Sequence, residues 1–263
     1  MASTLQASEL RYQENVDVIM KGNGIRAGVY SWQDNSLLVD DYVEGINSEP
    51  LNGSIDDVVY YFNYEGGTIK GYEPDDDYQI LQDYSAGQTT RNYPDYYNIG
   101  VATMNFRNLS KHIEFKEEWF EGNTSESIIN QLHQRDDVAL FPEQLKEKGY
   151  KIKDQVTLQY SNASKMTGTS EKSVEIIGFY SLFPIASVYQ YSPSVLIPNA
   201  TIYDGDFSNI DFVVYPKQET LIRNVSYKEI SKALKSVNPS AYISNPVENY
   251  EEQNMFFKST VNF

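Results

Sequence analysis

The sequence predicts an α+β fold in which both chain ends build one lobe and the middle forms a smaller, inserted mixed α/β lobe. Three observations lead to this prediction: a strand–helix–strand pattern near the N-terminus, the same order in the last third, and a hairpin-containing segment between them. Each βαβ unit needs another apolar surface to bury its sheet face. The two units from the two ends therefore pair into one split lobe.

The N-terminal unit is predicted from short apolar runs separated by turn residues. A strand at 16–20 ends at the turn signal Lys21-Gly22-Asn23-Gly24, and a second apolar run follows at 25–32. A helix over 36–46 ends before Pro50 and Gly53, and a strand over 58–64 precedes Gly66-Gly67.

The middle of the chain begins with a loop-rich stretch and continues with mixed elements. Asn123, Thr124 and Ser125 offer N-caps for a helix over 125–134, and Pro142 opens a brief helix with Leu145 inward and Gly149 at its C-cap. The other predicted elements are a loop over 67–98, strands at 100–106 and 138–141, alternating strands around 156–160 and 174–178 joined by a polar hairpin loop, and short strands at 194–197 and near 202.

The last third repeats the order of the first. A strand over 210–215 precedes the capping box Ser226-Tyr227-Lys228-Glu229, which starts a helix to Val237 that Pro239 stops. A strand at 241–244 and a helix from Val247 to about Ser259 follow, the latter with its apolar residues clustered late. The sequence thus predicts one lobe from residues 12–66 and 205–263 and an inserted lobe from 67–204.

Composition excludes several classes of partner. The 21 basic residues are outnumbered by 37 acidic ones, for a net charge of −16, which disfavours nucleic acid and anionic lipid surfaces. The chain has no cysteine, so disulfides, thiolate metal sites and cysteine nucleophiles are excluded. No stretch of the sequence approaches the roughly 18 consecutive apolar residues that cross a bilayer.

The sequence predicts no catalytic, cofactor-binding or metal-binding residue. His112 and His133 lack metal-ligand spacing, and no P-loop, GxSxG elbow or HExxH motif occurs. Asp204-Gly205-Asp206 resembles the start of a calcium loop, but the sixth position is Asn209 and the twelfth Tyr215. Asp75-Asp76-Asp77 is interpreted as another acidic turn.

An extracellular carbohydrate-binding module or glycosidase stays open as the alternative. The 22 tyrosines could form a sugar platform, and Glu117-Glu118-Trp119 places acids beside an aromatic ring that could desolvate them. A cell-surface adhesion module is a third interpretation. Asn-x-Ser/Thr sequons give weak support for a glycan-bearing surface protein; they begin at Asn52, Asn108, Asn123, Asn162, Asn199 and Asn224.

Several segments resemble the extracytoplasmic core domain of MacB/FtsX-type ABC transporter permeases. They are Phe141-Pro142-Glu143-Gln144-Leu145, the stretch from Gly149 to Leu158 that matches a Gly-x-Lys-x-Gly-Asp pattern, Val174 to Phe179, the opening 15–24, and the closing unit of 212–215, 226–237 and 242–244. The resemblance covers about 15–260. Lys153 stands where the pattern has glycine, and 67–98 match nothing in it.

The resemblance implies a porter-like lobe from the two chain ends, with a C-terminal stalk helix, and an inserted sabre-like lobe. It further implies a non-enzymatic domain without cofactor on the extracytoplasmic face of the cell membrane. Its partners would be its own flanking membrane helices, a cytoplasmic ATPase subunit that drives transport or mechanical signalling, and a second permease copy. The transported substrate is not identified by any residue of the sequence.

Overall fold

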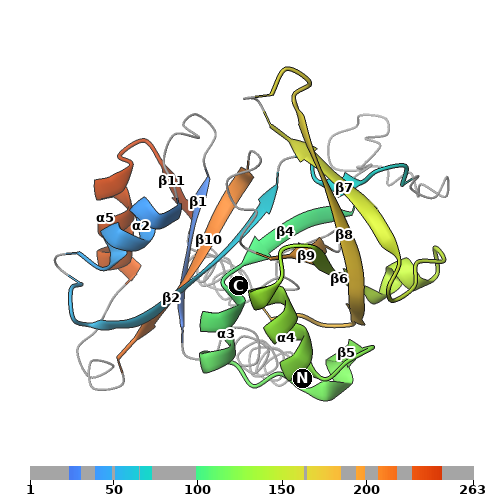
Figure 1. The fold of residues 1–263 in the computed structure, drawn as a ribbon. Coiled ribbons are helices and arrows are strands. Elements are labelled where there is room, and N and C mark those ends of the chain that lie inside the picture. The colour runs from blue at the N-terminus through green and yellow to red at the C-terminus, as the bar shows by residue number, and fades with distance from the viewer. Residues whose placement is uncertain are drawn as a thin grey trace, which may run out of the picture. The chain divides into compact units, whose positions relative to one another are not determined.

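The computed structural model confirms the predicted α+β class (Figure 1). It describes residues 24–30, 39–48, 51–64, 66–72, 99–162, 165–184, 194–198, 207–217 and 227–244. The described residues form two compact units. Unit 1 lies within 1–62, 105–114 and 207–263, and unit 2 within 63–104 and 115–206. Residues 105–114 thus group with the chain ends, although the sequence analysis assigns them to the inserted lobe.

The sheet of unit 1 interleaves strands from the two ends of the chain. Its order is β11 (Tyr242–Ser244), β1 (Ile25–Tyr30), β10 (Phe207–Pro216) and β2 (Ile55–Tyr64). Strand β1 is antiparallel to both of its neighbours, with Ile25 opposite Val214 in β10 and Gly28 opposite Ser244 in β11. The last residue of β11 therefore lies opposite the middle of β1, and β1 begins and β11 ends toward the same end of this strand pair.

Helices cover both faces of this sheet. On one face lie α2 (Val39–Ile46) and α5 (Tyr227–Val237), which pack side by side (Figure 1). The Tyr42 ring of α2 lies 5.9 Å from the Phe212 ring of β10. Tyr215 lies three residues further along the strand, so its side chain points to the opposite face. There it contacts α3 (Phe106–His112) through His112.

Apolar side chains fill the space between the sheet and its helices. Ile230 and Leu234 of α5 are fully buried, as is Ile46 of α2. Gly45 of α2 allows a close approach to α5, because a Cβ built there would lie 2.2 Å from Cγ2 of Val237. The Asn238 side-chain amide donates a 3.2 Å hydrogen bond to the Tyr42 hydroxyl and joins the two helices.

Unit 2 contains a mixed sheet. Its strands are β3 (Thr68–Ile69), β4 (Gly100–Met104), β5 (Phe120–Glu121), β6 (Val138–Pro142), β7 (Gln155–Ser161), β8 (Thr169–Tyr180) and β9 (Ser194–Ile197). The order is β4-β9-β6-β8-β7-β3, with β5 also on β8. The predicted hairpin is the antiparallel β7–β8 pair, and β6 and β8 are parallel.

The helical segments of unit 2 follow the sequence prediction in part, since the short helix after Pro142 is capped by Glu147 and not by the predicted Gly149. Helix α4 (Ser125–Gln134) has the predicted bounds and Thr124 as its N-cap. The 3-10 helices η2 (Glu117–Trp119) and η3 (Glu143–Lys146) complete the unit, and Leu145 of η3 is buried as predicted. Aromatic rings pack together in this unit. The centroid of the Phe183 ring lies within 6.0 Å of the ring centroids of Phe115, Phe120 and Tyr180.

Three predictions are wrong in part. The strand predicted over 58–64 begins at Ile55, and the loop predicted over 67–98 contains β3. The strand predicted over 100–106 stops at Met104, and α3 begins at Phe106 because Asn105 is an N-cap whose side chain accepts the amide of Asn108. Other predictions lie outside the described residues: the strand at 16–20, the loop residues 75–77, the strand near 202, the turn 204–206, Ser226 of the capping box and the helix over 247–259.

Candidate functional site

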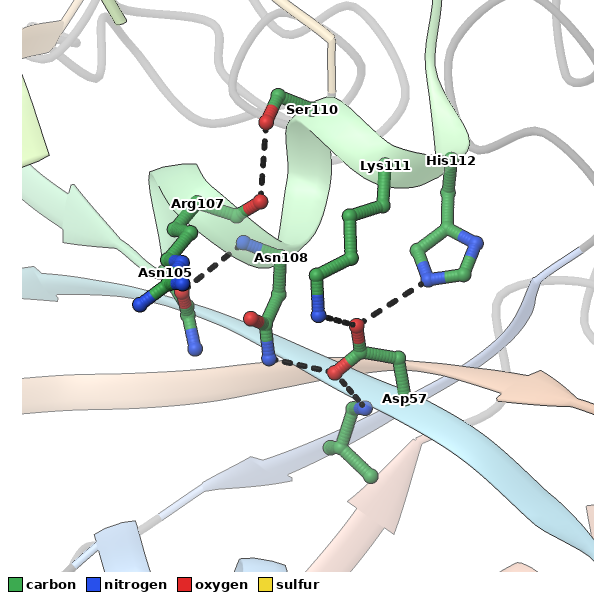
Figure 2. Close-up of polar contacts among 8 residues, drawn as sticks. Asp57, Asn105, Arg107, Asn108, Ser110, Lys111 and His112 are labelled. Atoms are coloured by element: carbon green, nitrogen blue, oxygen red, sulfur yellow. Dashed lines mark hydrogen bonds and ion pairs between the residues drawn. The ribbon is translucent and has the colours of Figure 1, made fainter. Parts of the chain in front are cut away.

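Helix α3 is positioned on β2 by its N-cap. The Asn105 amide donates a 3.2 Å hydrogen bond to the Tyr60 carbonyl of β2, and the Asn105 side-chain oxygen accepts the Asn108 amide at 3.1 Å. Phe106 and Leu109 are buried, which fixes the helix rotation. Asn108, Lys111 and His112 are consequently brought to the strand at Asp57 (Figure 2).

Asp57 is the centre of the polar cluster of unit 1. Its Oδ1 accepts hydrogen bonds from the Val58 amide at 3.1 Å and from the side-chain amide of Asn108. Its Oδ2 lies 2.9 Å from Nζ of Lys111 and 3.3 Å from Nε2 of His112 (Figure 2). The Asp57 side chain is only 11% exposed, so these contacts replace the water that its carboxylate loses on burial.

His112 links this cluster to strand β10. Its ring stacks on Tyr215 with centroids 3.7 Å apart and ring planes 6° apart. Burial raises the pKa of the Tyr215 phenol well above its ordinary value, and the negative charge of Asp57 raises it further. Tyr215 therefore stays neutral at physiological pH and serves as an aromatic surface for the imidazole.

An open pocket of about 240 Å³ lies beside the cluster. Its lining is mostly carboxylate and amide side chains: Asp40, Val43, Asn47, Asp56, Asp57, Val58, Tyr60, Asn105 and Asn108. The hydroxyl of Ser110 in α3 donates a 2.9 Å hydrogen bond to the Arg107 carbonyl and does not face Asp57 (Figure 2). The cluster thus has the geometry of an anchor for α3: one carboxylate holding three side chains of a seven-residue helix.

Glu117, one of the two acids considered for glycoside hydrolysis, has a structural role. Both oxygens of Glu117 accept the Ser125 amide, at 3.2 and 2.9 Å, and Oε1 also accepts the Ser125 hydroxyl at 2.6 Å. These hydrogen bonds, the hydroxyl first, lower the pKa of Glu117. A general acid in a glycosidase needs the opposite shift. Glu117 instead caps the start of α4, and Glu118 is exposed beside it.

The two histidines lie in different units, and the sequon asparagines differ in their surroundings. His133 lies in the last turn of α4, away in sequence and unit from His112, and no group of three potential metal ligands forms among the described residues. Asn52 is exposed, whereas Asn162 is buried and donates to the Ser170 hydroxyl. Asn108 and Asn123 use their side-chain amides in hydrogen bonds to Asp57 and the Ile177 carbonyl. Asn199 and Asn224 lie outside the described residues.

Lys153 has the backbone conformation that glycine favours. Its φ is 75°, and it is the one described non-glycine residue in the left-handed region. The Lys153 amide bonds the Ile176 carbonyl at 2.8 Å, and Asp154 accepts the Lys151 amide at 2.8 Å. The turn of the Gly-x-Lys-x-Gly-Asp pattern is therefore formed although its glycine is replaced.

Sequence reasoning missed the Asp57 cluster. It weighed His112 only as a metal ligand, which its spacing disfavoured, and Asn108 only as a sequon, because their partners come from separate parts of the chain. The available signal was Asn105 as an N-cap before Phe106 and Leu109 at helical spacing, which would have predicted α3. No helix within the described residues has the length and apolar character needed to cross a membrane.

Solved structures similar to this chain were found, whereas no family model and no curated protein matches it. The periplasmic region of MacB from Actinobacillus actinomycetemcomitans has 13% identity and a TM-score of 0.45, covering 92% of this chain and 96% of that one. A domain of a permease protein from Porphyromonas gingivalis has 12% identity and a TM-score of 0.42, covering 84% and 88%. The first is of the type that the sequence resembles. At these values the likeness carries no argument about activity.

Proposed function

We propose that the chain is the extracytoplasmic domain of an ABC transporter permease of the MacB/FtsX type. The observation that carries the proposal is the pairing of β1 with β11, the first and last described strands of unit 1. Because the two strands are antiparallel, with Gly28 opposite Ser244 and Tyr30 opposite Tyr242, β1 begins and β11 ends toward the same end of the strand pair. A domain inserted between two membrane helices requires this arrangement.

The domain would be non-catalytic in this proposal. Asp57 and Glu117 are both engaged in holding helices, α3 and α4, rather than directed at a substrate. Membrane helices would flank unit 1, and a cytoplasmic ATPase subunit would drive their movement. The interleaved sheet of unit 1 would pass this movement on as a rigid body, because each βαβ unit is hydrogen-bonded to the other.

The membrane location is tested in cells that produce the complete gene product. The chain has no cysteine, so a Glu126→Cys substitution on the exposed face of α4 gives a single reactive thiol in this domain. A membrane-impermeant maleimide should label it equally well in intact and lysed cells. Labelling that requires lysis would overturn the assignment. The gene should also encode apolar runs of about 20 residues on either side of the domain.

The coupling to ATP hydrolysis needs a separate test. The complete protein, solubilised in detergent and purified by a tag on its own chain, should bring an ATPase subunit with it. The stability of this complex should depend on nucleotide. If no nucleotide-binding protein is recovered with the chain, although the maleimide still labels intact cells, the coupling to ATP hydrolysis is rejected. The extracytoplasmic location then still stands. The two parts of the proposal are thereby separated.

A further inference from the structure

The outer surface of the helix pair in unit 1 carries opposite charges on its two helices. Helix α5 exposes Lys228, Lys232 and Lys235, while its acid Glu229 is half-buried. Helix α2 exposes Asp40, Asp41 and Glu44. None of the three lysines forms an ion pair among the described residues. We call these two sets the lysine stripe and the acidic stripe.

The lysine stripe faces away from the core. Its members follow one another at intervals of four and three residues, so they lie on one face of α5. Ile230, Ala233 and Leu234 occupy the buried face. In a chain of net charge −16, a helix whose outer face is basic is an exception to the overall electrostatics. The stripe would therefore attract an acidic partner that the rest of the surface repels.

The two stripes are held next to each other. Gly45 allows α2 to approach Val237 of α5 closely, and Asn238 donates a hydrogen bond to Tyr42. Figure 1 shows the two helices side by side. A twofold axis that lies in the plane between two facing copies, parallel to the helices and midway between them, would place α5 of one copy on α2 of the second copy, and the reverse. Such an interface is self-complementary, as closed dimers require.

We propose that the α2–α5 surface binds a second copy of this chain, with the lysine stripe of each copy against the acidic stripe of the other. The proposal rests on the proposed function and deepens it, since it names the surface through which two extracytoplasmic domains would meet. A second copy supplies carboxylates at the spacing of a helix, whereas an anionic lipid surface would also face the remaining net negative charge of the chain. Because exposed ion pairs are individually weak, the dimer should be weak and sensitive to salt.

The test exchanges the charges of the two stripes separately. One variant of the 263-residue chain carries Lys232→Glu and Lys235→Glu, and the other carries Asp41→Lys and Glu44→Lys. Sedimentation equilibrium over a range of protein concentrations, at about 0.15 M salt, should show a dimer for the natural sequence. Each variant alone should lose at least about tenfold in affinity, and an equimolar mixture should recover it, because every contact in the mixed dimer is again between opposite charges.

If association depended on net charge alone, the variants would behave differently from the outcome expected for a specific interface. The Asp41→Lys, Glu44→Lys variant is less negative than the natural chain, so without a specific interface it should associate more, not less. A Lys116→Glu, Lys151→Glu variant is the matched control for the lysine change, since both side chains are exposed in unit 2. It should keep the dimer. Far-UV circular dichroism checks that each variant is folded.

A second measurement does not depend on tolerance to charge reversal. Equal amounts of Glu44→Cys and Lys232→Cys chains, mixed and oxidised, should give more disulfide-linked dimer than either chain alone, with Lys151→Cys as the control partner. The proposal is overturned by a monomer at all concentrations or by a mixture that fails to recover association. It is also overturned if the lysine variant instead loses binding to vesicles of anionic phospholipid. None of these results changes the maleimide labelling, so the proposed function is judged separately.

Discussion

Replacing Asp57 by alanine should release α3 from the sheet. The substitution removes the acceptor for the Val58 amide and the Asn108 side chain, and the partners of Lys111 and His112. Two hydrogen bonds contribute about 1 kcal/mol each, and the half-exposed Lys111 pair adds about 0.5 kcal/mol. Leaving the partly buried donors without an acceptor adds about 1 kcal/mol to the loss of stability. The expected loss is therefore about 2–4 kcal/mol.

The measurement is hydrogen exchange at the amides of α3. The Leu109 amide bonds the Asn105 carbonyl and the Ile113 amide bonds the Leu109 carbonyl, both at 3.1 Å, so they report on this helix directly. A loss of 2–4 kcal/mol corresponds to roughly 30- to 700-fold faster exchange. A seven-residue helix has little stability of its own, so opening should follow the loss of its anchor.

Asp56→Ala is the matched control for this prediction. Asp56 is the neighbouring carboxylate on the same strand and is exposed, so its loss should change exchange in α3 by less than about threefold. Equal exchange in the Asp56 and Asp57 variants would refute the anchoring role of Asp57. The cluster would then be a consequence of α3 packing through Phe106 and Leu109 rather than a cause of it.

Three further predictions concern other positions. Lys153→Gly should raise the free energy of unfolding by about 0.5–1 kcal/mol in a urea titration, because glycine adopts φ of 75° without strain; an equal gain for Lys151→Gly would contradict this. Gly45→Ala should lower it by about 1–3 kcal/mol through overlap with Val237, and adding Val237→Ala should restore most of the loss. Because hydrogen bonds from Ser125 lower the pKa of Glu117 in the folded state, its contribution is present above the unfolded pKa of about 4.3 and is lost as pH falls through the folded value. Glu117→Gln should thus reduce thermal stability at pH 7, by an amount that shrinks as pH falls below the unfolded pKa, and Glu118→Gln should show no such dependence on pH.

The sequence predicted best those elements whose signals are local. Helix α4 follows from the cap at Thr124 and the spacing of Ile128, Ile129 and Leu132, all of which are buried as expected. The β7–β8 hairpin follows from its alternation, and Leu158 and Ile176 are both in the core. In each case the residues that determine the element lie within it, so a short window of sequence contains the information.

The parts that were missed depend on contacts between distant residues. Val101 to Met104 is an apolar strand that runs directly into Phe106, and only the hydrogen bonds of Asn105 separate strand from helix. Asp57 meets Asn108 and His112 across about fifty residues, and Tyr215 comes from the last third. No local pattern brings these positions together, because the sheet order does so.

The interleaved sheet of unit 1 also determines the order in which the protein can fold. Strand β1 is made first, yet both of its neighbours, β10 and β11, follow the whole of unit 2 in the chain. The hydrogen bonds of β1 cannot form until synthesis is almost complete, whereas the described strand pairs of unit 2 close within residues 68–197. Unit 2 should acquire structure first on the nascent chain, and unit 1 should close last and slowly, since its pairings have high contact order. A chaperone that protects the exposed edge of β1 would act in that interval.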